Sequence, residues 1–287
     1  MVSLMRGGLA VLIACQIALA QFVKPREPVS PSGSLADGLI RAYCLTPADS
    51  LNGIGAGAIY DYAGIFNAQT IGTSGTRWTN CGTESPCYEC GPTGTRWIAA
   101  GRGLDTLVTN QLSIVMRLKL TAAGTTNDAF SFIDFNPTQN VSSYFRDVDY
   151  DADATTFWID GATSDPSINM GDLGNDGDIV TLIFIYNGSD SLYGYLNSNP
   201  TRIAAAVGGG NIQIVTNDLM AFGHSYNSGL VYWFGQFVMG CIWNRVLTLS
   251  ERLQIQADPY VMFRAGSSDS DREIIARRGA ARKKIYR

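Results

Sequence analysis

The segment from Phe237 to Arg264 constrains the fold more than any other part of this chain. Its apolar run, Phe237–Trp243, has the composition of a buried strand. Thr248 and Glu251 follow with the spacing of a capping box, in which each side chain bonds the other residue's backbone amide at the start of a helix. Pro259 cannot continue that helix. The segment therefore predicts a closing strand followed by one short C-terminal helix.

The rest of the body favours many short strands. Of the 287 residues 46% are hydrophobic and only 16% are charged, and 31 are glycine, a mix typical of strands joined by polar turns. The clearest strands are Leu39–Leu45, Gln111–Leu120, Ile179–Tyr186 and its hairpin partner Ser191–Leu196. We therefore predict an all-β fold, a two-sheet antiparallel jelly-roll sandwich with one short C-terminal helix and extended N- and C-terminal arms.

Two of these strands also predict which residues are buried. In Gln111–Leu120, Arg117 and Lys119 alternate with apolar residues, so the two basic side chains should lie on the face opposite the core. Ile179–Tyr186 is apolar almost throughout, which predicts a central strand.

Charge divides the chain into three parts. Residues 35–264 carry 21 acids and 11 bases, whereas residues 1–34 are +2 and residues 265–287 are +4. This predicts a sandwich body at 35–264, an apolar and proline-rich arm at 1–34 and a basic tail at 265–287. The tail is expected to dock on the acidic body of a sister subunit rather than on nucleic acid. Its docking residues would be Arg277, Arg278, Arg282, Lys283, Lys284 and Arg287.

The N-terminus leaves two interpretations open. Arg6 precedes an apolar run that ends in small residues at Ala18–Ala20, which is the pattern of a secretory or lipoprotein signal. The same run suits a retained docking arm, which is the interpretation we favour. It is too short to cross a bilayer comfortably, so a membrane enters only if residues 1–20 act as a signal.

The body cysteines predict disulfide or thiol contacts. They are Cys44, Cys81, Cys87, Cys90 and Cys241. The three between residues 81 and 90 predict either one loop disulfide with one thiol left over or part of a zinc site, and zinc needs a fourth ligand although the one histidine, His224, is distant in sequence. The cysteines of the first and last strands would be neighbours, bonded or packed, if those strands pair.

Four stretches resemble the concanavalin A-like, laminin G-type jelly roll found in bacteriophage virion proteins. Residues 35–40 resemble its opening "plarGLv", residues 111–120 its "fSvaarvrl" strand, residues 183–197 its "vyDGs…lYvNG" hairpin and residues 241–264 its "lyNRaLsaaEi…adPyalfr" ending. The resemblance covers residues 35–264. Asn187 stands where the family has an aspartate that helps to place calcium in related domains, so we predict no metal and no cofactor.

The sequence predicts no enzyme. Residues 223–227, GHSYN, begin like a nucleophile elbow but lack its final glycine, and the chain has no second histidine to serve as base, so a polar loop is expected there. The body glutamates are only Glu84, Glu89 and Glu251, and the paired carboxylates of sandwich glycosidases are absent. The five tryptophans are expected in the core, with a sugar-stacking platform as the alternative.

The family resemblance implies a non-enzymatic virion structural protein, such as a capsid decoration or fibre, anchored by its arms. Its partners would be other virion subunits, including copies of itself, and its location the virion. The alternative is an exported, lectin-like carbohydrate-binding module, secreted or at a cell surface, with a glycan as its ligand.

Overall fold

The structure, a computed structural model, describes the chain in stretches between Lys24 and Arg264. These are residues 24–25, 28, 30–46, 58–64, 68–72, 78–90, 96–99, 110–120, 129–130, 133–134, 144–149, 154–158, 166–171, 173–175, 177–188, 191–199, 201–202, 204–207, 210, 212, 221–222, 224–225, 231–232 and 235–264. The apolar run at residues 1–20, for which a docking arm and a signal are both open, lies outside these stretches. So do most of the other residues of the N-terminal arm, the whole basic tail and most of the strand expected near residues 211–215.

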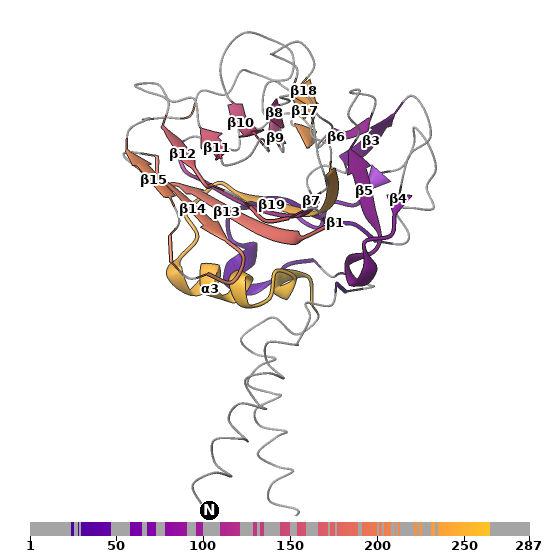
Figure 1. Cartoon of the computed structure of the whole chain (residues 1–287). Helices are drawn as coiled ribbons and strands as arrows, with labels where there is room; N and C mark the ends of the chain where they lie inside the picture. The colour runs from indigo at the N-terminus through magenta and orange to yellow at the C-terminus, as the bar shows by residue number, and fades with distance from the viewer. Residues whose placement is uncertain are drawn as a thin grey trace, which may run out of the picture.

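Within the described residues the strands form two large antiparallel sheets (Figure 1). The first has eight strands, seven of them in the order β15–β14–β13–β7–β19–β5–β4, with β1 also paired to β19. Their bounds are β15 Ala204–Val207, β14 Ser191–Leu196, β13 Ile179–Tyr186, β7 Leu112–Leu120, β19 Gly235–Trp243, β5 Cys87–Cys90, β4 Trp78–Thr79 and β1 Leu39–Cys44.

The second sheet has nine described strands, eight of them in the order β12–β11–β10–β9–β16–β6–β3–β2, with β8 paired to β10. Their bounds are β12 Ser167–Asn169, β11 Ala154–Trp158, β10 Tyr144–Asp149, β9 Ile133–Asp134, β16 Ala221–Phe222, β6 Arg96–Ala99, β3 Ala68–Gly72, β2 Ala58–Ile59 and β8 Ala129–Phe130. A separate two-stranded ribbon pairs β17, His224–Ser225, with β18, Val231–Tyr232. The polar loop expected at residues 223–227 is therefore wrong for His224 and Ser225, because their backbone pairs with β18.

The two sheets bury their facing sides against each other. Phe222 of the second sheet stacks on Phe237 of the first at 4.6 Å between ring centroids, and it meets Tyr43 of β1 edge-on at 6.1 Å. Gly240 allows this approach, because a Cβ there would lie 3.0 Å from the Phe222 ring and 2.8 Å from that of Phe237. This contact between layers confirms the predicted antiparallel sandwich.

The predicted closing strand and helix are confirmed. β1 and β19 pair antiparallel from Leu39 opposite Trp243 to Cys44 opposite Met239. After β19 the chain forms α3, Leu249–Ala257, whose first turn carries the full capping box between Thr248 and Glu251. Among the described residues α3 is the single α-helix, and the others are the short 3-10 turns η1 Gly33–Ala36, η2 Gly82–Glu84 and η4 Val261–Phe263.

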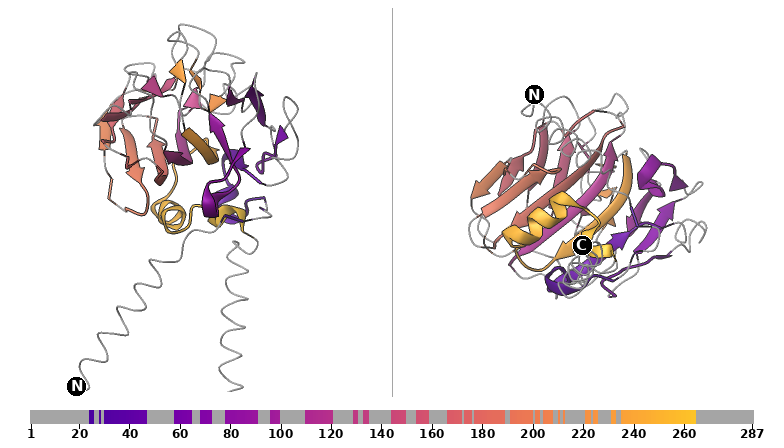
Figure 2. Two further views of the ribbon diagram at one scale, coloured as in Figure 1. Left: turned by 45° about the vertical axis from the view of Figure 1, so that its right-hand side comes forward. Right: turned by 90° about the horizontal axis from the view of Figure 1, so that it is seen from below.

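The helix explains why the central strands are apolar on both faces. Seen from below, α3 lies across the first sheet on the side away from the second sheet (Figure 2). In β13, Leu182 and Phe184 join the core between the sheets, whereas Ile183 and Ile185 join a second core beneath the helix. β13 is thus a central strand, as predicted. In the described part of the chain, no helix has both the length and the apolar character needed to span a bilayer.

Candidate functional site

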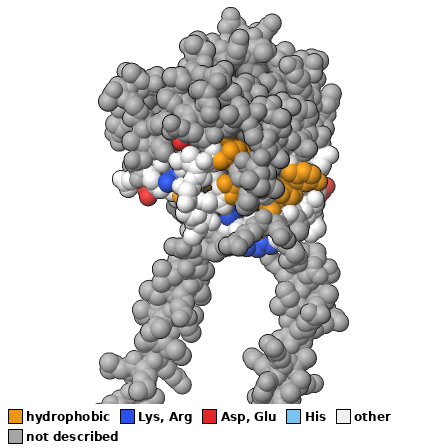
Figure 3. All heavy atoms as spheres, turned by 90° about the vertical axis from the view of Figure 1, so that its right-hand side faces the viewer, with side chains coloured by type: hydrophobic (Ala, Val, Ile, Leu, Met, Phe, Trp, Pro, Cys, Tyr) orange, Lys and Arg blue, Asp and Glu red, His pale blue; other side chains and the backbone are white. Residues whose placement is uncertain are grey.

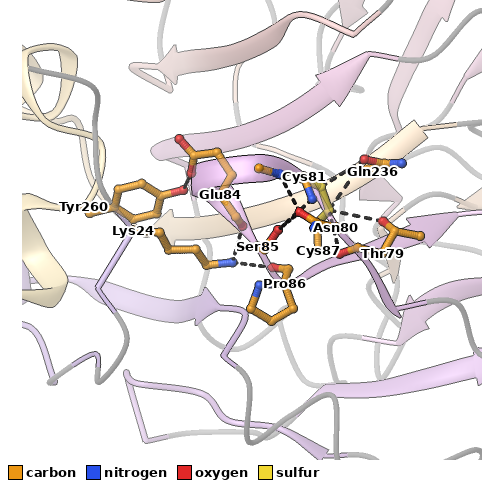
Figure 4. The surroundings of a disulfide bond; sticks show 11 residues. Lys24, Thr79, Asn80, Cys81, Glu84, Ser85, Pro86, Cys87, Gln236 and Tyr260 are labelled. Carbon is orange, nitrogen blue, oxygen red and sulfur yellow. Dashed lines mark hydrogen bonds between the residues drawn. A yellow bond between two sulfur atoms is a disulfide. The ribbon is translucent and has the colours of Figure 1, made fainter. Parts of the chain in front are cut away.

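A polar junction lies where the first and last described segments meet the body (Figure 4). Lys24 Nζ donates hydrogen bonds to Pro86 O at 2.6 Å and to Glu84 O at 3.2 Å. The Glu84 carboxylate accepts from Arg117 of β7, with Nη2 at 2.6 Å and Nε at 3.1 Å, and from the Tyr260 hydroxyl. Three parts of the chain far apart in sequence therefore meet on the short turn η2.

Burial makes this junction a structural element rather than a reactive one. Glu84 and Arg117 are buried, and Arg117 also donates to Thr181 Oγ1 at 2.6 Å. Burial, and after it the charge of Glu84, raises the pKa of Tyr260 well above its usual range, so the phenol keeps its proton at neutral pH. The alternation of β7 correctly places Arg117 opposite the core residues, but it gives no sign of the buried partner that the cysteine loop supplies.

The structure places each of the predicted cysteines. Cys81 and Cys87 form a disulfide that closes the loop carrying η2, and Cys90 is buried and takes no part in a disulfide. This arrangement is the predicted loop disulfide with one thiol left over. It uses two of the three thiols that a zinc site would need. In the described residues no group of three or more His, Cys, Asp or Glu side chains is arranged to hold a metal ion.

The cysteines of the first and last strands are packed rather than bonded. Cys44 lies opposite Met239, and Cys241 lies opposite Ala42. Both are buried beneath α3 and take no part in a disulfide. Burial, and after it the neighbouring Cys44, raises the pKa of Cys241 well above its usual range, which keeps that sulfur protonated and unreactive.

The face of the first sheet that carries α3 is occupied by the protein itself. The Arg252 guanidinium of α3 lies 4.1 Å from the centre of the Tyr195 ring, and Arg202 lies 5.0 Å from that of Tyr193. Gln256 of α3 donates to the carbonyl of Asn197, in the turn after β14. Both faces of the first sheet are therefore covered, one by α3 and the other by the second sheet.

Apolar side chains reach the surface on the side of the molecule that carries β3, β4 and β5 (Figure 3). Among the described residues Tyr60 is the one large aromatic side chain that is exposed, at 50%. It meets Tyr62 edge-on at 4.8 Å, and Tyr62 meets Phe263 of η4 at 5.5 Å. A single exposed ring tied to the body in this way is ordinary surface and does not form a platform.

Register defines the outer face of the second sheet, the face turned away from the core. Ile98, Phe222 and Ile168 are buried between the sheets. Successive residues of a strand lie on opposite faces, and directly paired residues share a face. Trp97, which precedes Ile98 in β6, therefore takes a position on the outer face, and so does Ala221, which precedes Phe222 in β16.

The same register extends the outer face across β9, β10 and β11. Ala221 pairs with Asp134, and Asp134 pairs with Tyr144. Two residues further along β10, Arg146 pairs with Trp158 of β11.

The pairing of β11 with β12 independently assigns Trp158 to the same face. Phe157 pairs with the buried Ile168, so the next residue, Trp158, takes the outer face. The outer face thus carries three aromatic positions, Trp97, Tyr144 and Trp158, alongside Asp134 and Arg146.

The structure describes the side chains of two of the five tryptophans, Trp78 and Trp243. Trp243 is fully buried and its indole donates to Leu35 O at 2.8 Å, and Trp78 packs against the core, as expected for core residues. For Trp97 and Trp158 the core expectation stays a prediction, because the structure describes only their backbone, whose register assigns both residues to the outer face. Trp233 lies outside the described residues, as do all six predicted docking residues, from Arg277 to Arg287.

Comparison with known proteins identifies relatives by structure alone. No protein-family model matches the chain, and no curated protein matches its sequence. The chain is similar in structure to domain 4 of AbnA, a GH43 extracellular arabinanase from Geobacillus stearothermophilus, solved in complex with arabinotriose. The TM-score is 0.54 and the identity 16%, and the match covers 76% of this chain and 98% of that one.

Toxin binding domains are similar as well. The binding domain of Paraclostridial Mosquitocidal Protein 1 matches with a TM-score of 0.57 and 12% identity. The binding domain of botulinum neurotoxin DC, in complex with SialylT, matches with a TM-score of 0.54 and 12% identity. Each match covers 78% of this chain but 52% of the toxin chain, so this chain spans about half the length of these relatives. At these identities the likeness shows an all-β sandwich fold.

Proposed function

We propose that the protein is a non-enzymatic carbohydrate-binding module whose ligand lies along the outer face of the second sheet. The observation that carries this proposal is the register of Trp97, Tyr144 and Trp158 on one face. Four strand steps separate β11 from β6, so at a spacing of about 4.8 Å the aromatic positions extend over about 19 Å. A row of this length suits an extended oligosaccharide, because sugar rings present apolar faces that stack on aromatic side chains.

Polar groups at the same register fit such a ligand. Asp134 lies level with Tyr144, and Arg146 lies level with Trp158. A carboxylate accepts hydrogen bonds and a guanidinium donates them, so the two types together match the hydroxyl groups of a sugar. The aromatic positions would supply contact area with the sugar, and the polar positions would fix its orientation.

Two further points support the proposal. Two of the structural neighbours were solved in complex with arabinotriose and with SialylT, and they are an extracellular enzyme domain and a toxin binding domain. They favour the exported, glycan-binding alternative over the virion role that the family resemblance implies. Two of the body glutamates, Glu84 and Glu251, are buried in ion pairs with Arg117 and Arg245, which argues for binding rather than hydrolysis.

Anchoring through the terminal segments fits the same arrangement. Lys24 and Tyr260 both bond to Glu84, so the chain enters and leaves the described body at one junction. That junction lies on the side that carries α3, opposite β10 and β11 (Figure 1). A module held by residues 1–34 and 265–287, on a virion, on a cell surface or beside a sister subunit, would present its outer face to a glycan.

The test is glycan binding by the full chain on an array that contains arabino-oligosaccharides and sialylated oligosaccharides, followed by calorimetry with the best ligand. Trp158→Ala should weaken binding at least tenfold, about 1.4 kcal/mol, while Trp158→Phe keeps most of the affinity. The matched control is Tyr60→Ala, which removes an exposed ring outside the proposed site. An array without any bound glycan, or equal affinities for wild type and Trp158→Ala, would refute the proposal.

A further inference from the structure

The N-terminal segment is held to the sandwich by an unusual lysine. Lys24 is only 5% exposed, although lysine is almost never buried without a partner. Its ammonium group donates to two backbone carbonyls, those of Glu84 and Pro86. Carbonyl oxygens bind an ammonium group only where the backbone holds them close together, so these two contacts of Lys24 depend on the conformation of this one loop.

The disulfide closes the loop that carries both carbonyls. Both acceptor carbonyls lie inside the ring that Cys81 and Cys87 close. Within the ring Ser85 Oγ accepts from the Cys81 amide at 2.7 Å and donates to Asn80 Oδ1 at 2.6 Å, and the Ser85 amide bonds to Gly82 O at 3.2 Å. These bonds lie within a loop that is closed twice, by the disulfide and by the pairing of β4 with β5, in which Thr79 lies opposite Cys87.

The sandwich itself does not depend on this ring. β5 pairs with β19 through Gly235 opposite Cys90, and with β4 through Trp78 opposite Tyr88. The central strands β13 and β19 each pair with β7, which lies between them, and none of the three takes part in the disulfide. Opening the ring should therefore loosen the loop and leave the sheets in place.

We propose that the Cys81–Cys87 disulfide is a redox-sensitive clasp that fixes the N-terminal segment at Lys24 to the body. A dithiol reductant would open the clasp by giving two electrons and two protons to the disulfide, which becomes two thiols while the reductant becomes a disulfide. The loop then loses the geometry of its two carbonyls and releases the ammonium group. Because disulfides persist in oxidising compartments, the clasp closes where an exported protein works.

This inference stands apart from the proposed glycan site, since the loop lies on the first sheet and the glycan site on the second. It also assigns different roles to the backbone carbonyl and the side-chain carboxylate of Glu84. The backbone carbonyl holds Lys24 and depends on the ring. The carboxylate pairs with Arg117 and Tyr260, and its charge keeps that pair in place after the ring opens.

The experiment measures the acetylation rate of each lysine in the full chain, with and without dithiothreitol, by mass spectrometry. Reduction should speed acetylation of Lys24 at least tenfold, because a buried ammonium group that donates to two carbonyls reacts slowly. Lys119 of β7 is the internal control and should keep its rate. Cys81, Cys87 and Cys90 are all buried in the closed protein, so labelling of Cys81 and Cys87 by iodoacetamide without labelling of Cys90 shows that the loop opens while the sandwich stays folded.

Three outcomes of this reduction experiment would overturn the clasp. One is an unchanged Lys24 rate when Cys81 and Cys87 are labelled. Another is a rise in Lys24 reactivity only together with Lys119 and Cys90, which means that the whole domain unfolds. The third is resistance of the native disulfide to the reductant. The double variant Cys81→Ser with Cys87→Ser provides the same comparison without reductant, and a wild-type Lys24 rate in that variant would also overturn the proposal.

Discussion

The ion pair between Arg245 and Glu251 gives the sharpest prediction. Glu251 is the third residue of α3 and is buried. Its carboxylate accepts from Arg245 Nη1 and Nη2, each at 2.8 Å, and from the Thr248 amide and hydroxyl, each at 2.9 Å. Arg245 also donates to the carbonyls of Ser34 and Asp37, so this carboxylate ties α3 to the start of the body. The perturbation is Glu251→Gln, which keeps the shape and removes the charge.

The pKa of Glu251 gives the magnitude. Burial alone would raise this pKa, but the hydrogen bonds from Arg245 and Thr248 outweigh it and lower the pKa from an ordinary value of 4.5 to about 2. Each pKa unit is worth about 1.4 kcal/mol, so the ionised carboxylate stabilises the fold by about 3 kcal/mol at pH 7. Because the folded pKa is the lower one, this stability is complete above pH 4.5 and declines as the pH falls toward 2.

Urea unfolding followed by tryptophan fluorescence measures the effect. Glu251→Gln should cost about 3 kcal/mol at pH 7, and about half of that difference from wild type should be gone at pH 3. The matched control is Asp37→Asn, which removes a carboxylate 3.9 Å from the same Arg245 but with an 85% exposed side chain. It should change stability at pH 7 by less than about 0.5 kcal/mol. A difference between Glu251→Gln and wild type that stays the same at pH 7 and pH 3 would refute the reasoning.

Two further predictions concern stability and use the same urea assay. Gly188→Ala should cost more than about 2 kcal/mol, because φ is +83° and the new Cβ would lie 1.8 Å from Asn110 O. Gly177→Ala, where φ is +89° but no atom lies within 4 Å, should cost only about 1 kcal/mol; equal losses would contradict the steric argument. Arg117→Met should cost about 3–5 kcal/mol because it leaves Glu84 buried without its cation. Adding Glu84→Gln to that variant should recover part of the loss, and a purely additive double variant would show that the pair is not coupled.

The sequence predicts the first sheet well because that sheet is built from local patterns. The period-two alternation of Gln111–Leu120 and the apolar run Ile179–Tyr186 both reflect burial that neighbouring residues enforce. The capping box at Thr248 is an interaction over three residues, so its spacing alone identifies it. The pairing of the first and last body strands follows from the family resemblance, and β1 lies beside β19 as that resemblance implies.

The candidate glycan face is a different kind of feature and is much harder to predict. Trp97 and Trp158 are 61 residues apart in the sequence, and their strands are short and surrounded by polar turns. Their common face depends on pairing through four intervening steps of the sheet, and a shift of one residue at any step would move one of them into the core. The partner of Arg117 is equally hard to predict, because Glu84 is distant in sequence and reaches Arg117 only through the fold of the disulfide loop.

The distribution of charge within the described body supports different roles for its two sides: one fixes the terminal segments, and the other is the proposed binding face. On the side of α3, Glu251 and Glu84 are each neutralised by an arginine, and each pair lies beside a described end of the chain: Arg245 bonds to Ser34 O, and Glu84 bonds to Tyr260. Charges buried in this way are costly to desolvate, and they are retained where they fix one geometry rather than add stability. The polar groups of this side therefore serve to fix the chain ends. The outer face of the second sheet, where we propose that a glycan binds, lies on the other side.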